Sequence, residues 1–104
     1  MKVAITSKGN TLDSVLDTRF GRCSYFAIYD TESKKLEFVE NPNLNANEGA
    51  GPSSVKLIAS YGVKKAVSGE FGFKIKSLMD DLSIQMIIVN EEKTINEIVE
   101  LLNK

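Results

Sequence analysis

The segment Arg19-Phe20-Gly21-Arg22-Cys23 holds the densest set of chemically active groups in the chain. Its two guanidinium groups are fixed donors for an anion, and their positive field is expected to lower the pKa of the Cys23 thiol. A thiolate formed in this way is a ligand for a soft metal. In the plainer interpretation, Phe20 fills the core, the arginines are solvated and Cys23 is a small buried hydrophobic residue. For Cys23 alone we favour the plainer interpretation, because one thiol without companions is a weak metal signal.

Glycine-rich turns ahead of two predicted helices form a second group of candidates. Gly49-Ala50-Gly51 leads into a helix start, where free N–H groups and the helix dipole favour an anion. Gly69, just before Gly72, lies in a second strand-to-helix turn, and open α/β sheets bind their ligands at this end of the parallel strands. Neither turn carries the phosphate-loop motif, and glycine-rich connectors before helices are common. The two turns together therefore predict a site more strongly than either does alone.

The distribution of charged residues and the absence of His exclude several kinds of partner and catalytic site. Between Gly51 and Met79 the charged residues are five lysines and one acid, Glu70, which lies inside the second turn. This local excess of positive charge suits either an anionic ligand or solvated helix faces. Over the whole chain, 13 basic residues face 14 acidic ones, so we expect no nucleic-acid partner and no membrane partner. The sequence has no His, which excludes Ser-His-Asp triads, Cys-His dyads and imidazole-dependent zinc sites.

Hydrophobic periodicity predicts the elements that position these residues. Strands are expected over 2–6, 25–29 and 36–39, the last two as an antiparallel hairpin. Two helix–strand units follow, with helices opening at Pro52 and spanning 71–82, and strands over 63–67 and 84–89. The strand over 84–89 is apolar enough to be buried on both faces. The capping box Thr94-Ile95-Asn96-Glu97 opens a last helix.

The resulting order, β-β-β-α-β-α-β-α, predicts one α/β domain over residues 1–104 with a mixed five-stranded sheet and helices packed on it. This order resembles the ribonuclease H-like architecture. The nucleases of that class need a carboxylate on the first strand to hold Mg²⁺, and the first strand here, Val3-Ala4-Ile5, has none. Phosphodiester cleavage is therefore not expected.

Several motifs follow one another along nearly the whole chain. They are Lys2-Val3-Ala4-Ile5-Thr6-Ser7, Leu12-Asp13-Ser14, Arg19 to Phe26, Glu40-Asn41-Pro42, Gly49-Ala50-Gly51, and Gly69 ahead of Gly72. In this order they resemble the dinitrogenase iron-molybdenum cofactor biosynthesis proteins of the NifX and NifB type. The resemblance implies a ribonuclease H-like α/β fold and non-enzymatic binding or carriage of an iron-sulfur or iron-molybdenum cluster during metallocofactor assembly.

The resemblance also suggests which residues bind the cluster. They are Arg19, Phe20, Gly21, Arg22, Cys23, Gly49, Ala50, Gly51 and Gly69, with Cys23 as the one metal ligand. The chain departs from the family pattern by lacking every His, including in the loop over 43–48 where some relatives are expected to carry one. A negatively charged, transiently bound cluster is then expected to be held by the two arginines and the N–H groups of the helix starts.

A second hypothesis stays open beside cluster carriage. It is a metal-free regulatory or protein-interaction module that binds a partner protein or a small anion. We expect no enzyme, because no set of nucleophile, base and orienting residue can be read from the sequence. The single Cys and the absence of an apolar leader at Met1 predict a cytoplasmic protein.

Overall fold

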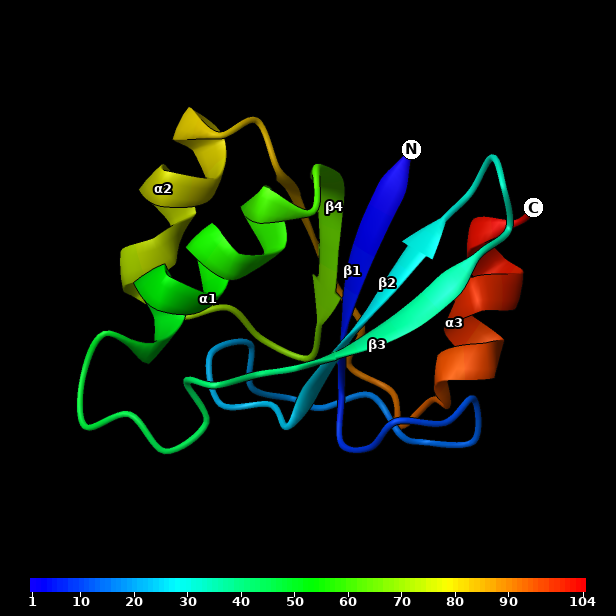
Figure 1. Ribbon diagram of the computed structural model, residues 1–104, viewed down its shortest axis with the longest axis horizontal. Helices are drawn as coiled ribbons and strands as arrows, with labels where there is room; N and C mark the ends of the chain where they lie inside the picture. Colours follow the sequence, from blue (N-terminus) through cyan, green and yellow to red (C-terminus); the bar gives the residue numbers. More distant parts are fainter.

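The computed structural model describes all residues, Met1–Lys104, and contains one sheet and three α-helices (Figure 1). The strands are β1 (Lys2–Ser7), β2 (Tyr25–Asp30), β3 (Leu36–Glu40), β4 (Val63–Ser68) and β5 (Gln85–Ile88). The helices are α1 (Ala50–Ser60), α2 (Lys76–Asp81) and α3 (Ile95–Leu102), with a 3-10 turn, η1 (Phe73–Ile75), directly before α2. The predicted order of elements is confirmed.

The five strands form one mixed sheet in the order β3-β2-β1-β4-β5. β2 is antiparallel to both β1 and β3, whereas β4 is parallel to both β1 and β5. The predicted hairpin and the predicted parallel half are therefore present. Because β1 and β4 run in the same direction, their carboxyl ends meet at one edge of the fold, at the bottom of Figure 1.

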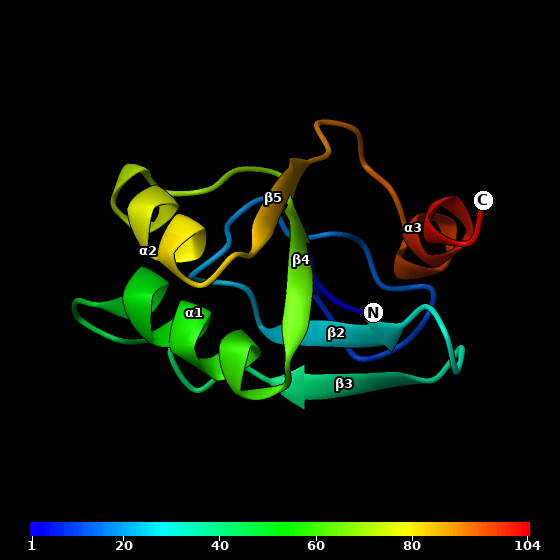
Figure 2. The same ribbon diagram turned by 90° about the horizontal axis from the view of Figure 1, so that it is seen from above.

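Helices cover the two faces of the sheet unequally (Figures 1 and 2). α1 and α2 lie on one face, over a buried cluster that includes Phe26, Ile58 and Met79. α3 alone lies on the other face, where Ile95 and Ile98 pack against a smaller cluster. Alternate residues of a strand point to opposite faces, so β1 contributes to both clusters.

The prediction that the strand over 84–89 is buried on both faces is wrong. The observed strand, β5, is an edge strand, and Gln85 and Ile88 at its two ends are exposed. An edge strand has a neighbour on one side only, and the helices do not cover its whole length. Apolar composition alone does not distinguish such a strand from a central one.

The ends of the helices follow local sequence signals with small shifts. α1 begins at Ala50, two residues before the predicted Pro52, and ends ahead of Gly62, whose φ of 77° suits glycine. The predicted helix over 71–82 is a 3-10 turn followed by the shorter α2. The capping box of α3 is confirmed, because Thr94 and Glu97 bond reciprocally. No helix combines the length and the apolar character needed to cross a membrane.

Candidate functional site

The loop that follows β1 is anchored to the carboxyl ends of the parallel strands. The Thr6 hydroxyl donates to the carbonyl of Asp17 at 2.7 Å, and the Asp17 N–H donates to the Thr6 carbonyl at 3.1 Å. The buried Asp17 carboxylate in turn accepts from the N–H of Arg19 at 2.9 Å. These bonds fix the start of the Arg19–Cys23 segment beside the sheet.

This segment and the start of α1 approach each other through glycine. A Cβ placed on Gly21 would lie 2.9 Å from the nitrogen of Gly51 and 3.0 Å from its Cα. A Cβ on Gly51 would in turn lie 2.9 Å from the Ile75 side chain at the end of η1. Three segments that are far apart in the sequence therefore meet at distances that exclude larger side chains.

A cavity of about 870 Å³ opens where these segments meet. It is lined by Arg19, Phe20, Gly21, Arg22, Glu48, Gly49, Ala50, Gly51, Pro52, Glu70, Gly72, Phe73, Lys74 and Ile75. Seven of the nine residues proposed from the sequence line it, and Cys23 and Gly69 do not. The lining combines three cationic side chains and two carboxylates with aromatic and aliphatic groups.

The two arginines have different environments. Arg22 donates from Nη1 to the carbonyl of Leu44 at 3.3 Å and to the carbonyl of Ala46, so its guanidinium holds the loop before α1. Arg19 is 58% exposed, with Nε 3.6 Å from the Asp17 carboxylate and Nη2 donating to the Arg22 carbonyl at 3.3 Å. Arg19 is thus the arginine with donors free to bind an incoming anion.

The start of α1 offers backbone donors to the cavity. Gly49, the N-cap, has a left-handed conformation with φ 74° and provides no side-chain cap, and the first turn carries no acidic residue. The first intrahelical donor is Ser53, whose N–H bonds to the Gly49 carbonyl at 3.0 Å. Because Pro52 has no N–H, the donors without an intrahelical acceptor are those of Ala50 and Gly51.

Cys23 does not have the environment expected for a reactive thiol. Its side chain is fully buried in the core, and Sγ donates to the Phe20 carbonyl at 3.3 Å. Burial, and secondarily the Asp17 carboxylate, raises the pKa of Cys23 to about 12. The expectation that the arginines lower this pKa is wrong, because desolvation has the largest effect on it and neither guanidinium group is among the groups that lower it.

Gly69 lies outside the cavity and has a packing role. A Cβ on Gly69 would lie 2.6 Å from the Cα of Thr18, so this glycine allows β4 to run close to the loop after β1. Its N–H donates to the Asp17 carbonyl at 3.4 Å. The other glycine of the same turn, Gly72, is the one that borders the cavity.

Phe73 was missed as a site residue by reasoning from the sequence. It lies on η1 at the mouth of the cavity, and it is 89% exposed. The sequence did contain one signal for its exposure. Phe71 and Ile75 have the spacing of one apolar helix face, and Phe73 does not lie on that face. Glu48 and Pro52 were also missed, although both flank the Gly49–Gly51 turn.

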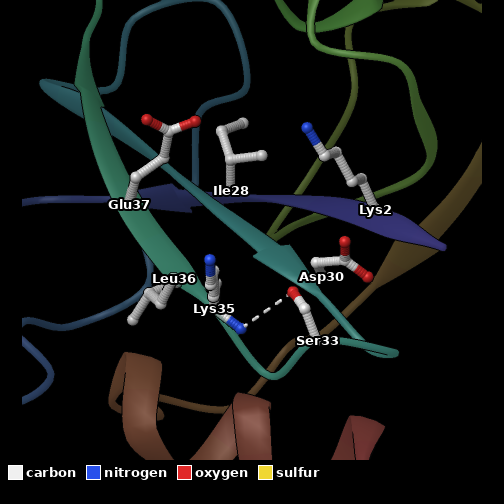
Figure 3. Close-up of a pocket in the computed structure, with 7 residues that line it drawn as sticks. All are labelled: Lys2, Ile28, Asp30, Ser33, Lys35, Leu36 and Glu37. Atoms are coloured by element: carbon white, nitrogen blue, oxygen red, sulfur yellow. Dashed lines mark hydrogen bonds between the residues drawn. The ribbon is translucent and has the colours of Figure 1, made fainter.

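Two other cavities lie elsewhere on the molecule. One, of about 540 Å³, is on the β2–β3 hairpin (Figure 3) and is lined by Lys2, Ile28, Asp30, Ser33, Lys35, Leu36 and Glu37. It contains none of the residues proposed from the sequence. The other, of about 370 Å³, lies beside the carboxyl end of β5. No group of three or more Cys, Asp or Glu side chains has an arrangement that would hold a metal ion.

Comparisons with known proteins agree with the sequence motifs. A family model described as dinitrogenase iron-molybdenum cofactor matches residues 1–104. The NMR structure of a presumed NifB protein from Thermotoga is 34% identical, with a TM-score of 0.82, over 95% of this chain and 84% of that one. The apo form of the orange protein from Desulfovibrio gigas is 27% identical, with a TM-score of 0.89, over 95% and 83%.

A more distant structure shares the fold. It is that of a presumed dinitrogenase from Methanocaldococcus jannaschii, which is 17% identical with a TM-score of 0.64, over 98% of this chain and 90% of that one. A search of curated proteins found no match.

Proposed function

The chain belongs to the dinitrogenase iron-molybdenum cofactor family, and we propose that it carries an anionic metal–sulfur cluster, non-covalently and without catalysis, in the 870 Å³ cavity. The cluster is cargo, bound transiently during metallocofactor assembly. Arg19 and the N–H groups of Ala50 and Gly51 bind its negative charge.

One observation carries this proposal: the two loops that bear the family motifs converge on one cavity that offers cationic and N–H donors and no thiol. Cys23, the sole Cys, lies in the core with its pKa raised to about 12, so it does not supply a thiolate at neutral pH. Binding through charge and hydrogen bonds suits a preformed cluster, whose own sulfides complete the coordination of its metals.

We also assign the sheet to the ribonuclease H-like architecture. The order β3-β2-β1-β4-β5, with β2 antiparallel to its neighbours and the second half parallel, supports this assignment. The cavity then lies where open α/β sheets bind ligands, beyond the carboxyl ends of the parallel strands.

Anaerobic titration with tetrathiomolybdate, the simplest soluble molybdenum–sulfur anion, tests the proposal. Retained molybdenum is measured after gel filtration, together with the visible spectrum. We expect about one anion per chain, with affinity reduced about fivefold in Arg19→Gln, since a charged hydrogen bond at a partly exposed site is lost. Lys56→Gln is the matched control, because Lys56 is exposed on α1 and does not line the cavity.

Cys23→Ala separates the two modes of binding. If Cys23→Ala retains as much molybdenum as the wild type, this result supports binding by Arg19 and the backbone N–H groups. Retention that is lost in Cys23→Ala but not in Arg19→Gln would instead assign the metal to the thiolate. Circular dichroism of each variant establishes that it is folded before its binding is compared.

The metal-free interaction module remains the second candidate because of Phe73. A side chain of this size that is 89% exposed at a cavity mouth is typical of a surface that a partner covers. If the protein retains neither tetrathiomolybdate nor an iron–sulfur cluster formed anaerobically from ferrous iron and sulfide, this module becomes the better account.

A further inference from the structure

The two edges of the sheet differ in their protection against pairing with another chain. β3 forms one edge and β5 forms the opposite one (Figure 2). β3 contains Glu37 and Glu40 and follows directly on Lys34 and Lys35, and charged side chains of this kind discourage added strands. β5 reads Gln-Met-Ile-Ile and has no charged residue. The β5 edge therefore lacks the charges that protect the other one.

Backbone groups on the β5 edge are directed away from the sheet. The N–H of Val89 donates to the Ser68 carbonyl of β4 at 3.0 Å. Alternate residues of a strand direct their backbone groups to the same side, so those of Met86 and Ile88 point to the open edge. No other strand pairs there, and the side chain of Ile88 is 58% exposed. An added strand would pair these groups and cover Ile88.

Carboxylates flank this edge at both ends. Asp80 and Asp81 precede β5, and Glu91 and Glu92 follow it, all four exposed. Glu91 and Glu92 also border the cavity of about 370 Å³, together with Glu70 and a single lysine, Lys8. The nearest other lysine, Lys93, is 3.7 Å from Glu91 and neutralises only part of this charge.

These charges decide which occupant fits. If two copies of β5 paired, acidic flanks would face acidic flanks in either strand direction, which opposes self-association. A segment with basic flanks would instead meet an opposite charge at each end.

We propose that the β5 edge binds an extended segment of a partner protein whose apolar centre is flanked by Lys or Arg. The segment adds a sixth strand through the backbone of Met86 and Ile88, as in other strand-addition complexes. One basic side chain reaches the cavity beside Glu91 and Glu92. This surface is separate from the cluster cavity except for Glu70, which borders both.

The test is a titration of the ¹⁵N-labelled protein, followed by NMR, with a short synthetic peptide that has Thr-Val-Thr-Val-Thr between two Lys pairs. We expect saturable shifts centred on the amides of Met86 and Ile88. A matched peptide with Glu pairs in place of the Lys pairs is expected to cause none. Shifts centred on β3, equal binding of both peptides, or no binding of the Lys peptide would overturn the proposal.

Two variants separate strand addition from simple charge attraction. Ile88→Pro removes an N–H that β4 does not use, so it blocks the edge while sparing the ladder, and binding should be lost. Glu91→Gln with Glu92→Gln should weaken binding about fivefold. Glu37→Gln, on the protected edge, is the control and should change nothing. Line broadening that rises with protein concentration in the absence of peptide would favour a second copy as the occupant and would contradict the proposal.

Discussion

Arg19 and Arg22 are three residues apart and line the same cavity, but they have different roles. Arg22 donates to the carbonyls of Leu44 and Ala46, whereas the guanidinium of Arg19 is mostly in solvent. One arginine therefore positions the loop that leads into α1, and the other is available to a ligand. The difference arises from partners more than 20 positions away in the sequence.

Replacement of Arg22 by Ala is expected to loosen the loop over 42–49. Without the guanidinium, the Leu44 and Ala46 carbonyls lose their shared donor, and local opening becomes easier. Amide hydrogen exchange should be faster in this loop and at the start of α1, with the sheet unchanged. Arg19→Ala is the matched control and should leave exchange in the loop as it is. Equal protection in the Arg22→Ala variant and the wild type would contradict this role.

The Cys23 thiol is expected to be inert at neutral pH in the folded protein. Its pKa is raised from 9.0 to about 12 because the thiolate would be buried. An aromatic disulfide reagent should therefore react at pH 8 only as fast as the protein opens, and rapidly in denaturant. Fast, complete reaction of the native protein would show that the thiol is accessible.

The same shift makes stability depend on alkaline pH. Because the pKa of Cys23 is higher in the folded protein than in the unfolded one, folding favours the protonated thiol. The contribution of this thiol to the free energy of unfolding is fully present below pH 9 and is lost as pH rises toward 12. Urea unfolding of the wild type should weaken more steeply across this window than that of Cys23→Ala. At pH 7 the Cys23→Ala variant should lose about 1 kcal/mol in the free energy of unfolding. If the free energies of unfolding of the two proteins fall in parallel between pH 9 and 12, the raised pKa of Cys23 is contradicted.

Residue types in the sequence indicated two loops that meet at one cavity, but not the exposure of each side chain in them. Arg19, Gly21 and Gly51 line one cavity, because their loops follow β1 and β3, two strands that run in the same direction and end on the same side of the sheet. The burial of Cys23 agrees with the plainer interpretation favoured for this residue, but the contacts that bury it, those of Phe20 and Asn41 with the sulfur, could not be predicted. The local sequence, one Cys beside two arginines, is the same whether the Cys side chain faces the cavity or the core, so this pattern alone does not decide between them.

At the scale of elements, the contact between the Arg19–Cys23 segment and α1 depends on glycine. Gly21→Ala would place a Cβ against the backbone of Gly51, and backbone atoms cannot rotate away. We expect a loss of about 1–3 kcal/mol in the free energy of unfolding, with weaker anion retention because the two loops move apart. Urea denaturation and tetrathiomolybdate titration measure the two effects.

Gly72 provides the matched control for this substitution. It also lines the cavity, but a Cβ there would meet nothing within 4 Å, and its φ is −62°. Gly72→Ala should therefore stay within about 0.5 kcal/mol of the wild type. If both alanine variants lose the same stability, the close approach of Gly21 to Gly51 is not what limits this contact.

Strong local sequence patterns predicted the helices and strands. The predictions that failed did so because they depended on the position of an element in the tertiary structure. The capping box fixed the start of α3, because both of its bonds form within one turn. β5 was misjudged because an apolar run is equally compatible with the centre and the edge of a parallel sheet. The short 3-10 turn before α2 was also missed, and this turn is what exposes Phe73 at the cavity mouth.

At the scale of the whole molecule, the sheet separates two cores with different relations to the site. The α1–α2 side contains Phe20 and Ile75, which also line the cavity, so the site and this core share side chains. The α3 side contains no residue that lines it. Both cores depend on the same strands, so we expect them to unfold together.

Two truncations of equal size, one in each core, test this arrangement. Ile58→Ala and Ile98→Ala each remove a buried isoleucine side chain, and each should cost about 2–5 kcal/mol. Urea denaturation should remain a single transition in both variants. Only Ile58→Ala should shift the amide signals of the cavity loops and weaken tetrathiomolybdate retention, because Ile58 packs in the core that contains Phe20 and Ile75. Equal disturbance of the cavity by Ile98→Ala would mean that the sheet transmits packing changes across its faces.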